Sequence, residues 1–292
     1  MIRLRKDRTK TKLDNILGYS FMLPWIIGFL VFTALPFFYT IYLSMFDVEF
    51  TVRGWELTWN SFDNYAIAFL RNTEFVPALI DFIIYLVSYV PVIIVISFIL
   101  AWMLNQKIRF RAGFRLIYFL PVIIMSGSVM QQLMDTGNTS FGSIQGSLIY
   151  KMILNYSVFL AQAMDYIFEN FTMVLWFTGI PIILMISGLS KINYSLYEAA
   201  KIDGASAWQA LWKITLPHMK HFMLVATIFT IVQLGMYSLN PLYQIIRNAI
   251  YNTAAGLGLA SSFAWIYSIV VLLVVLIAFL VFKDRKGRKS YE

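Results

Sequence analysis

Long apolar stretches separated by blocks of charge constrain this chain more than any other feature. The chain has 292 residues, of which 60% are hydrophobic and 13% are charged, and its mean hydropathy is +0.71. The apolar stretches are long enough to cross a hydrocarbon core of roughly 30 Å as helices. Because such a core offers no water to backbone N–H and C=O groups, spanning segments must satisfy them internally. We therefore predict an all-α integral membrane protein.

Six transmembrane helices are predicted from these stretches. The expected spans are about residues 17–46, 77–104, 114–134, 167–189, 222–240 and 259–282. An even number of spans puts both termini on one side of the membrane. In this layout 19 of the 23 Lys and Arg residues fall on the side of the termini, which the positive-inside rule assigns to the cytoplasm. The same bias accounts for the net charge of +8, so membrane lipid is an expected partner and nucleic acid is not. We expect one membrane domain over residues 1–292.

The stretch over residues 147–164 is the one that could change this layout. It is long enough to be a seventh span, but a span here would place the later basic loop and the basic tail outside, against the charge rule. Its apolar residues recur near helical spacing, with polar residues between them. An amphipathic helix on the outer face fits this pattern better. Residues 141–166 are therefore predicted to form an extracytoplasmic amphipathic insertion.

The sequence offers no catalytic or metal-binding constellation. It has no cysteine and two histidines, and it lacks a Gly-rich phosphate loop ending in Lys-Ser/Thr. We therefore expect no enzyme activity, no metal and no cofactor in this chain. The basic N-terminal segment precedes an apolar stretch much longer than a signal-peptide core, so no cleaved signal peptide is expected.

A long polar stretch, EAAKIDGASAWQALWKITLP, separates the fourth and fifth spans within residues 190–217. Ser195 and Glu198 have the S-x-x-E form of a capping box, which predicts a helix start near Ser195. Gly204 permits a turn, and Ser206 can cap a second short helix. Pro217 is tolerated where the next helix begins. A helix pair of this kind could also lie flat on the membrane surface.

The joint spacing of Glu-Ala-Ala, Gly and Ile-x-Leu-Pro is more specific, and it resembles the cytoplasmic loop of binding-protein-dependent ABC importer permeases. The segments FMLPWIIGFLVFTALPFFYTIYLSMFD, FRAGFRLIYFLPVIIMSGSVMQQLMD and WFTGIPIILMISGLSKINYSLYEAAKIDGA are similar to the first, third and fourth spans of the maltose/glycerol-phosphate-type first permease. Residues 141–166 match poorly.

The resemblance implies a type I ABC importer permease fold in a bacterial or archaeal cell membrane. It also implies a second homologous permease subunit, two ATP-binding subunits that hold ATP and Mg, and an extracytoplasmic solute-binding protein. The residues that it places in the ATPase-docking loop are Glu198, Ala199, Ala200, Asp203, Gly204, Ile214, Leu216 and Pro217.

Polar and aromatic residues within the spans are candidates for a solute pathway, because polar groups inside a membrane usually face the bundle interior. The candidates are Tyr85, Tyr89, Gln131, Gln132, Gln233, Tyr237 and Asn240. They form hydrogen bonds without net charge, which suits a neutral polyhydroxylated solute. The alternative role of each is hydrogen bonding between helices. The resemblance favours the pathway for the last three, because the family places substrate contacts on the matching span.

These observations together predict the permease subunit of an ATP-driven importer for a carbohydrate, in particular an oligosaccharide. A permease of the same fold for a glycerophosphodiester, a polyamine or a peptide is the first alternative. A stand-alone secondary transporter is the second. It would need ionisable residues inside the spans, where the charged residues Asp81, Arg115 and Glu169 all lie near an edge.

Overall fold

The chain forms two compact units in a computed structural model that describes residues 8–51, 54–106, 113, 147–158, 160–161, 164, 171–237, 240–251 and 256–283. The first unit comprises Met1–Val76 and Ile245–Ile266, and the second comprises Pro77–Gln244 and Tyr267–Glu292. The predicted third span, over residues 114–134, lies outside the described residues, so the count of six spans stays a prediction.

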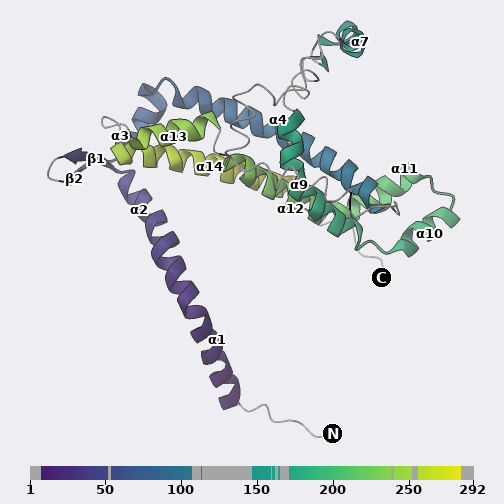
Figure 1. Cartoon of the computed structure of the whole chain (residues 1–292), viewed down its shortest axis with the longest axis horizontal. Coiled ribbons are helices and arrows are strands. Elements are labelled where there is room, and N and C mark those ends of the chain that lie inside the picture. The colour runs from purple at the N-terminus through teal and green to yellow at the C-terminus, as the bar shows by residue number, and fades with distance from the viewer. Residues whose placement is uncertain are drawn as a thin grey trace. The chain divides into compact units, whose positions relative to one another are not determined.

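Helices occupy the places of the five other predicted spans (Figure 1). Four helical segments are long and apolar enough to cross a membrane, and they are Tyr19–Leu43, Phe75–Asn105, Ala207–Gly235 and Gly256–Phe282. The helices Met173–Leu189 and Tyr194–Ile202, which meet at a bend of 65°, make a fifth candidate only when they are taken together.

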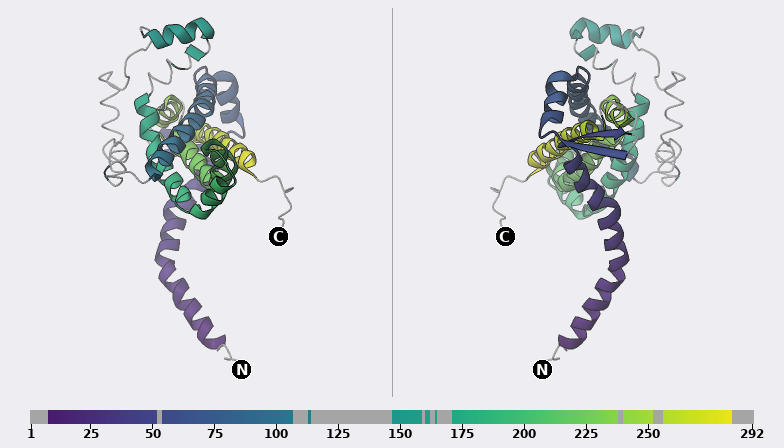
Figure 2. Two further views of the ribbon diagram at one scale, coloured as in Figure 1. Left: turned by 90° about the vertical axis from the view of Figure 1, so that its right-hand side faces the viewer. Right: turned by 90° about the vertical axis from the view of Figure 1, so that its left-hand side faces the viewer.

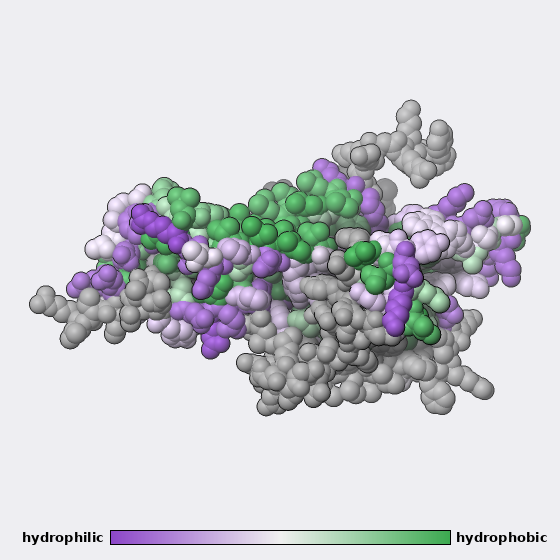
Figure 3. Space-filling view, turned by 90° about the horizontal axis from the view of Figure 1, so that it is seen from above, coloured by the Kyte–Doolittle hydropathy of each residue, from purple (hydrophilic) through white to green (hydrophobic). Residues whose placement is uncertain are grey.

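The surface of these helices is apolar. Large side chains such as those of Ile84, Leu272 and Ile277 are more than half exposed. On the face shown in Figure 3, hydrophobic side chains form a broad patch, and hydrophilic ones gather at both the left-hand and the right-hand end of the view. A soluble protein rarely exposes apolar surface of this extent, whereas lipid-facing helices do.

The first unit contains a β-hairpin that the all-α prediction did not include. Its elements in chain order are α1 (Arg8–Phe29), the π-helical turn η1 (Leu30–Ala34), α2 (Leu35–Leu43), β1 (Phe46–Thr51), β2 (Gly54–Trp59), α3 (Asp63–Ala66) and the π-helical turn η2 (Ile67–Arg71). The two strands are antiparallel and pair Phe46 with Trp59 (Figure 2). Alternation of polar and apolar residues over so few positions is a weak signal.

Asn64 ties the elements of the first unit together. Its buried Nδ2 donates to the carbonyl oxygens of Ser44 (3.0 Å) and Phe46 (2.9 Å), at the junction of α2 and β1. The Oγ of Ser262, on α14 (Gly256–Phe282), donates to the Leu259 carbonyl at 2.7 Å and lies 3.5 Å from the Asn64 carbonyl oxygen. One buried amide therefore provides hydrogen bonds to two backbone carbonyl groups where the chain passes from a helix to a strand.

The second unit holds most of the remaining helices. They are α4 (Phe75–Asn105), α7 (Leu148–Tyr156), α9 (Phe171–Leu189), α10 (Tyr194–Ile202), α11 (Ala207–Ala210), the π-helical turn η4 (Leu211–Thr215), α12 (Leu216–Gly235) and α13 (Pro241–Tyr251). Helices α4, α13 and α14 contribute residues to both units. Ser147 caps α7 by accepting from the Tyr150 N–H, and α7 has no buried residue. It is shorter than the insertion predicted over residues 141–166.

Two π-helical turns precede prolines, which the sequence did not reveal. In η1 the N–H of Leu35 donates to the carbonyl of Leu30, and Pro36 follows. In η4 the N–H of Leu216 donates to the carbonyl of Leu211, and Pro217 follows. Proline cannot donate to the carbonyl four residues earlier, and its ring crowds that carbonyl. The wider turn shifts the hydrogen-bond register just before the proline, so the helix continues.

Helices α9 and α12 pack closely against each other (Figures 1 and 2). At Gly188 a Cβ atom would lie 2.6 Å from Cγ of Phe222 and 2.8 Å from Sδ of Met219. Close helix packing in membranes depends on small residues of this kind. The contact fixes the ends of α9 and α12 that border the polar loop.

We predict that Gly188→Ala destabilises the protein by about 1 to 3 kcal/mol, because the added methyl group overpacks the α9–α12 contact. Thermal unfolding of the detergent-solubilised chain measures the change. Gly28→Ala is the matched control, since no atom lies within 4 Å of a Cβ at that helical position. Equal melting temperatures for both variants would contradict the packing role of Gly188.

Candidate functional site

The Glu-Ala-Ala loop forms two arms that extend beyond the ends of α9 and α12 (Figure 1). The first arm is α10, and its N-cap is Asn193, whose side chain accepts from the N–H of Ser195 at 3.1 Å. The predicted capping box of Ser195 with Glu198 is therefore wrong. Both residue types are good N-caps, and the one that lies two positions earlier takes the role.

A Schellman motif ends the first arm and turns the chain. The N–H of Ala205 donates to the carbonyl of Ala200 at 2.9 Å, and the N–H of Gly204 donates to the carbonyl of Lys201 at 3.2 Å. Gly204 has a φ of +74°, a conformation that costs other residues energy. The turn predicted at Gly204 is confirmed, and it explains why a glycine follows Glu-Ala-Ala at this spacing.

The second arm starts as predicted but continues further than expected. Ser206 and Gln209 form a reciprocal capping box at the start of α11. The helix then runs without a break through η4 into α12, from Ala207 to Gly235. The second arm is thus the first part of a long helix and not the separate short helix that was expected before Pro217.

Four of the eight predicted docking residues help to line a hollow of about 440 Å³ between the arms. Its lining residues are Ala200, Asp203, Gly204, Ala205, Gln209, Ala210, Lys213 and Ile214. Four further docking residues line no part of this hollow, and they are Glu198, Ala199, Leu216 and Pro217. Both carboxylates, on Glu198 and Asp203, are on exposed residues. The loop thus exposes acidic residues beside a hollow.

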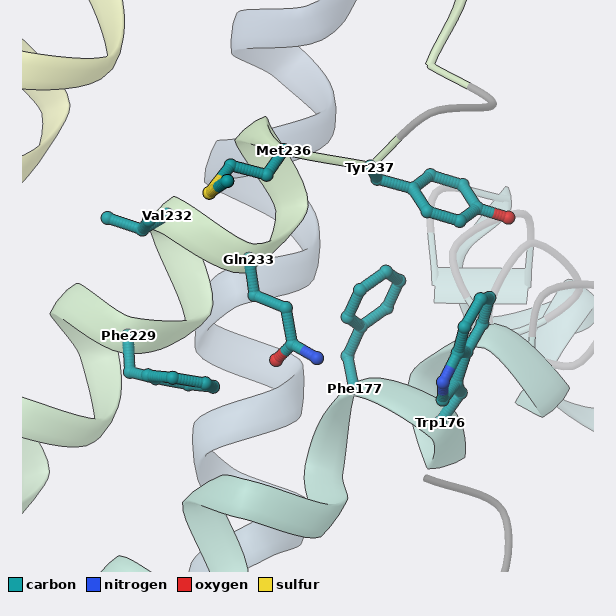
Figure 4. A pocket seen from close by; sticks show the side chains of 7 residues that line it. All are labelled: Trp176, Phe177, Phe229, Val232, Gln233, Met236 and Tyr237. Carbon is teal, nitrogen blue, oxygen red and sulfur yellow. The ribbon is translucent and has the colours of Figure 1, made fainter. Parts of the chain in front are cut away.

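A pocket of about 330 Å³ lies between α9 and α12 near the C-terminal end of α12 (Figure 4). Its lining residues are Trp176, Phe177, Phe229, Val232, Gln233, Met236 and Tyr237. The Tyr237 ring meets the rings of Trp176 and Phe177 edge to face, with centroids 5.5 Å and 5.4 Å apart. Such geometry is favourable for aromatic pairs. Aromatic rings therefore form one wall of the pocket.

Gln233 supplies the polar group of this pocket. Its side chain points from α12 toward Phe177 on α9 (Figure 4). Its Oε1 is buried and has no hydrogen-bond partner in the part of the chain that the structure describes. A buried acceptor without a partner is costly, so the pocket suits a ligand that donates a hydrogen bond there. A largely apolar pocket with one placed polar group is typical of small-molecule sites.

The other predicted pathway residues that the structure describes, Tyr85, Tyr89 and Asn240, do not line this pocket. Tyr85 and Tyr89 contact each other on α4, with ring centroids 4.3 Å apart. Asn240 is buried; its Oδ1 accepts from the Leu242 N–H and its Nδ2 donates to the Tyr267 hydroxyl. Those bonds cap α13 and join it to α14. Gln131 and Gln132 lie outside the described residues.

Trp176 and Phe177 are pocket residues that sequence reasoning missed. The predicted pathway residues were chosen for their polar groups within the spans, whereas Trp176 and Phe177 are buried aromatic residues. The two adjacent aromatic residues in the first half of this span were a signal. Only packing of α9 against α12 places them opposite Gln233.

Residues 66–283 match the family described as "Binding-protein-dependent transport system inner membrane component". The chain is 26% identical to the probable ABC transporter permease protein YesP of Bacillus subtilis, over 94% of this chain and 93% of that protein. It is 28% identical to the lactose transport system permease protein LacF of Rhizobium radiobacter, over 94% and 96%. Its identity to the multiple sugar-binding transport system permease protein MsmF of Streptococcus mutans is 23%, over 96% and 98%.

The fold is also similar to that of solved transporters. A chain of a bacterial alginate ABC transporter, in complex with an alginate pentasaccharide-bound periplasmic protein, has a TM-score of 0.68 at 18% identity. The match covers 96% of this chain and 97% of that one. Since the matched region includes both the loop and the pocket and most of the sequence, the chain belongs to the family of binding-protein-dependent transport system inner membrane components.

Proposed function

We propose that this chain is the permease subunit of an ATP-driven importer that translocates a carbohydrate, in particular an oligosaccharide. The observation that carries the proposal is the pocket in which aromatic rings form one wall and Oε1 of Gln233 has no hydrogen-bond partner among the described residues. A sugar ring has apolar C–H faces that pack on aromatic rings and hydroxyl groups that donate to an amide oxygen. The relatives named for lactose, multiple sugars and arabinooligosaccharides support this class of solute.

Two observations indicate the remaining subunits. The sequence has no Gly-rich phosphate loop for ATP, and its family belongs to binding-protein-dependent transport systems. An extracytoplasmic solute-binding protein delivers the sugar. Two ATP-binding subunits hold ATP and Mg, and a second homologous permease completes the pathway. The exposed Glu198 and Asp203 and the hollow between α10 and α11 form the contact with one ATP-binding subunit.

The charge distribution supports an orientation with both termini and the Glu-Ala-Ala loop in the cytoplasm. In that orientation α12 runs outward, so the pocket lies near its extracytoplasmic end, on the side of the solute-binding protein. Closure of the ATP-binding subunits moves the loop, and α12 carries this movement toward the pocket. ATP binding, which acts at the loop end of α12, is thereby linked to access of the solute to the pocket at the other end.

Glu198→Lys and Gly204→Pro are expected to remove the ATP-binding subunit from the purified complex. The first reverses a charge at the contact, and the second cannot adopt the positive φ of the turn. The yield of co-purified ATPase activity should fall more than about tenfold. Glu74→Lys, an exposed charge reversal outside the loop, should leave it unchanged. Solute transport in liposomes by this chain alone would overturn the proposal.

Substitution in the pocket should lower sugar uptake without loss of assembly. We expect Gln233→Ala to raise the KM by about 2- to 10-fold, the cost of one lost hydrogen bond, and Trp176→Ala to raise it further. Uptake of radiolabelled lactose, arabinooligosaccharides and alginate oligosaccharides by cells measures the effect, for whichever sugar the unaltered protein transports. Val225→Ala, on an exposed face of α12, is the control. Unchanged uptake in both pocket variants would remove the pocket from the pathway.

The orientation can be tested with single cysteines, because the natural chain has none. We expect Thr73→Cys to react with a membrane-impermeant maleimide in intact spheroplasts. Ala207→Cys should react only after the membrane is opened. Both positions are exposed in the structure of this chain, and expression without the ATP-binding subunits keeps the loop uncovered, so failure to react reports the membrane. The reverse pattern would invert the proposed topology.

A further inference from the structure

A relay of two hydroxyl groups joins the arms of the Glu-Ala-Ala loop. The hydroxyl of Tyr197, on α10, lies 2.8 Å from Oγ1 of Thr215, the last residue of η4. Oγ1 of Thr215 also bonds the carbonyl oxygen of Ala210, at 3.4 Å. Because a threonine hydroxyl has one proton and a carbonyl can only accept, Thr215 donates to Ala210 and Tyr197 donates to Thr215. Thr215 is only 2% exposed, so water does not easily replace this bond.

The position of the relay determines how freely the arms can move against each other. Apart from the relay, the arms are connected at the turn that contains Gly204. The backbone turns at Gly204, and the hollow between the arms separates much of their length. Within residues 194–216, all of which the structure describes, Tyr197–Thr215 is the one side-chain hydrogen bond between α10 and the second arm. At 1.5 Å per residue it lies about 10 Å along α10 from the turn. The bond therefore joins the two arms at the end that lies away from the turn.

The relay attaches to the second arm at its π-helical turn. There the helix has shifted its backbone register, since the Leu216 N–H bonds the Leu211 carbonyl. The hydroxyl of Thr215 supports the Ala210 carbonyl, and Nδ1 of His218 lies 2.7 Å from the Ile214 carbonyl. Side chains thus hold the part of the arm where the regular helix is interrupted.

We propose that Tyr197 is a positioning residue for energy coupling. Its hydrogen bond holds α10 against η4, so that the loop moves as one rigid unit. The movement of the ATP-binding subunit then passes to α12. Without this bond the arms can hinge at Gly204, and part of the movement is absorbed there. The inference rests on the proposed function, because it takes the loop as the contact with the ATP-binding subunit.

Tyr197→Phe removes one hydroxyl and leaves the aromatic ring in place. In the complete transporter, purified through a tag on this chain and reconstituted in liposomes, we expect the amount of bound ATP-binding subunit to stay the same. The number of sugar molecules transported per ATP hydrolysed should fall about 2- to 10-fold, as expected for one hydrogen bond. A merely structural loss would lower the yield of complex and leave this ratio unchanged.

The loop offers matched controls. Tyr194→Phe removes the hydroxyl of a tyrosine on the same helix that is 70% exposed, and it should keep the transport ratio of the unaltered protein. Thr215→Val should reproduce the defect of Tyr197→Phe, whereas Thr215→Ser should retain most of the coupling. The double variant Tyr197→Phe/Thr215→Val should be no worse than either single one, because both remove the same bond.

An unchanged transport ratio in Tyr197→Phe would overturn the inference while the proposed function stands. Loss of the ATP-binding subunit from that variant would also overturn it, since Tyr197 would then act in docking and not in coupling. If no ATP-binding subunit co-purifies with the unaltered chain, the proposed function fails, and the inference fails with it.

Discussion

The need to pair every backbone N–H and C=O group without help from water governs the described part of this protein. The candidate membrane segments meet this need by forming helices, some of them more than 25 residues long. Where the regular helical hydrogen bonds are interrupted, another group supplies the hydrogen bond. The π-helical turns before Pro36 and Pro217 shift the hydrogen-bond register, and the Asn64 amide binds two carbonyl oxygens at the β-hairpin junction.

Local rules predicted much of the loop, because its form depends on a few residues close in sequence. The positive φ of Gly204 and the cap at Ser206 both followed from residue type and spacing. The start of α10 did not, since Asn193 and Ser195 are equally good caps and only the structure shows which one is used. The π-helical turn η4 was also missed, because a proline near a helix start is compatible with an ordinary N-terminus.

The residues that line the pocket were predicted only in part from the sequence. Gln233 and Tyr237 stood out as polar groups in an apolar span, and both line it. Trp176 and Phe177 did not, because a buried aromatic residue in a span is usually packing. Asn240 had the same polar signal as Gln233, yet its amide binds Tyr267 and Leu242. Whether a polar side chain faces a cavity or a neighbouring helix depends on tertiary contacts that one sequence does not specify.

The unbroken course of the helix from η4 through α12 has a geometric consequence. Eighteen residues separate Thr215 from Gln233, and eighteen residues complete five full turns of an ideal α-helix. The two side chains therefore share one angular phase, about 27 Å apart along the axis. In the function proposed above, a rotation of this helix about its axis at Thr215 would turn the Gln233 amide in the aromatic pocket through the same angle.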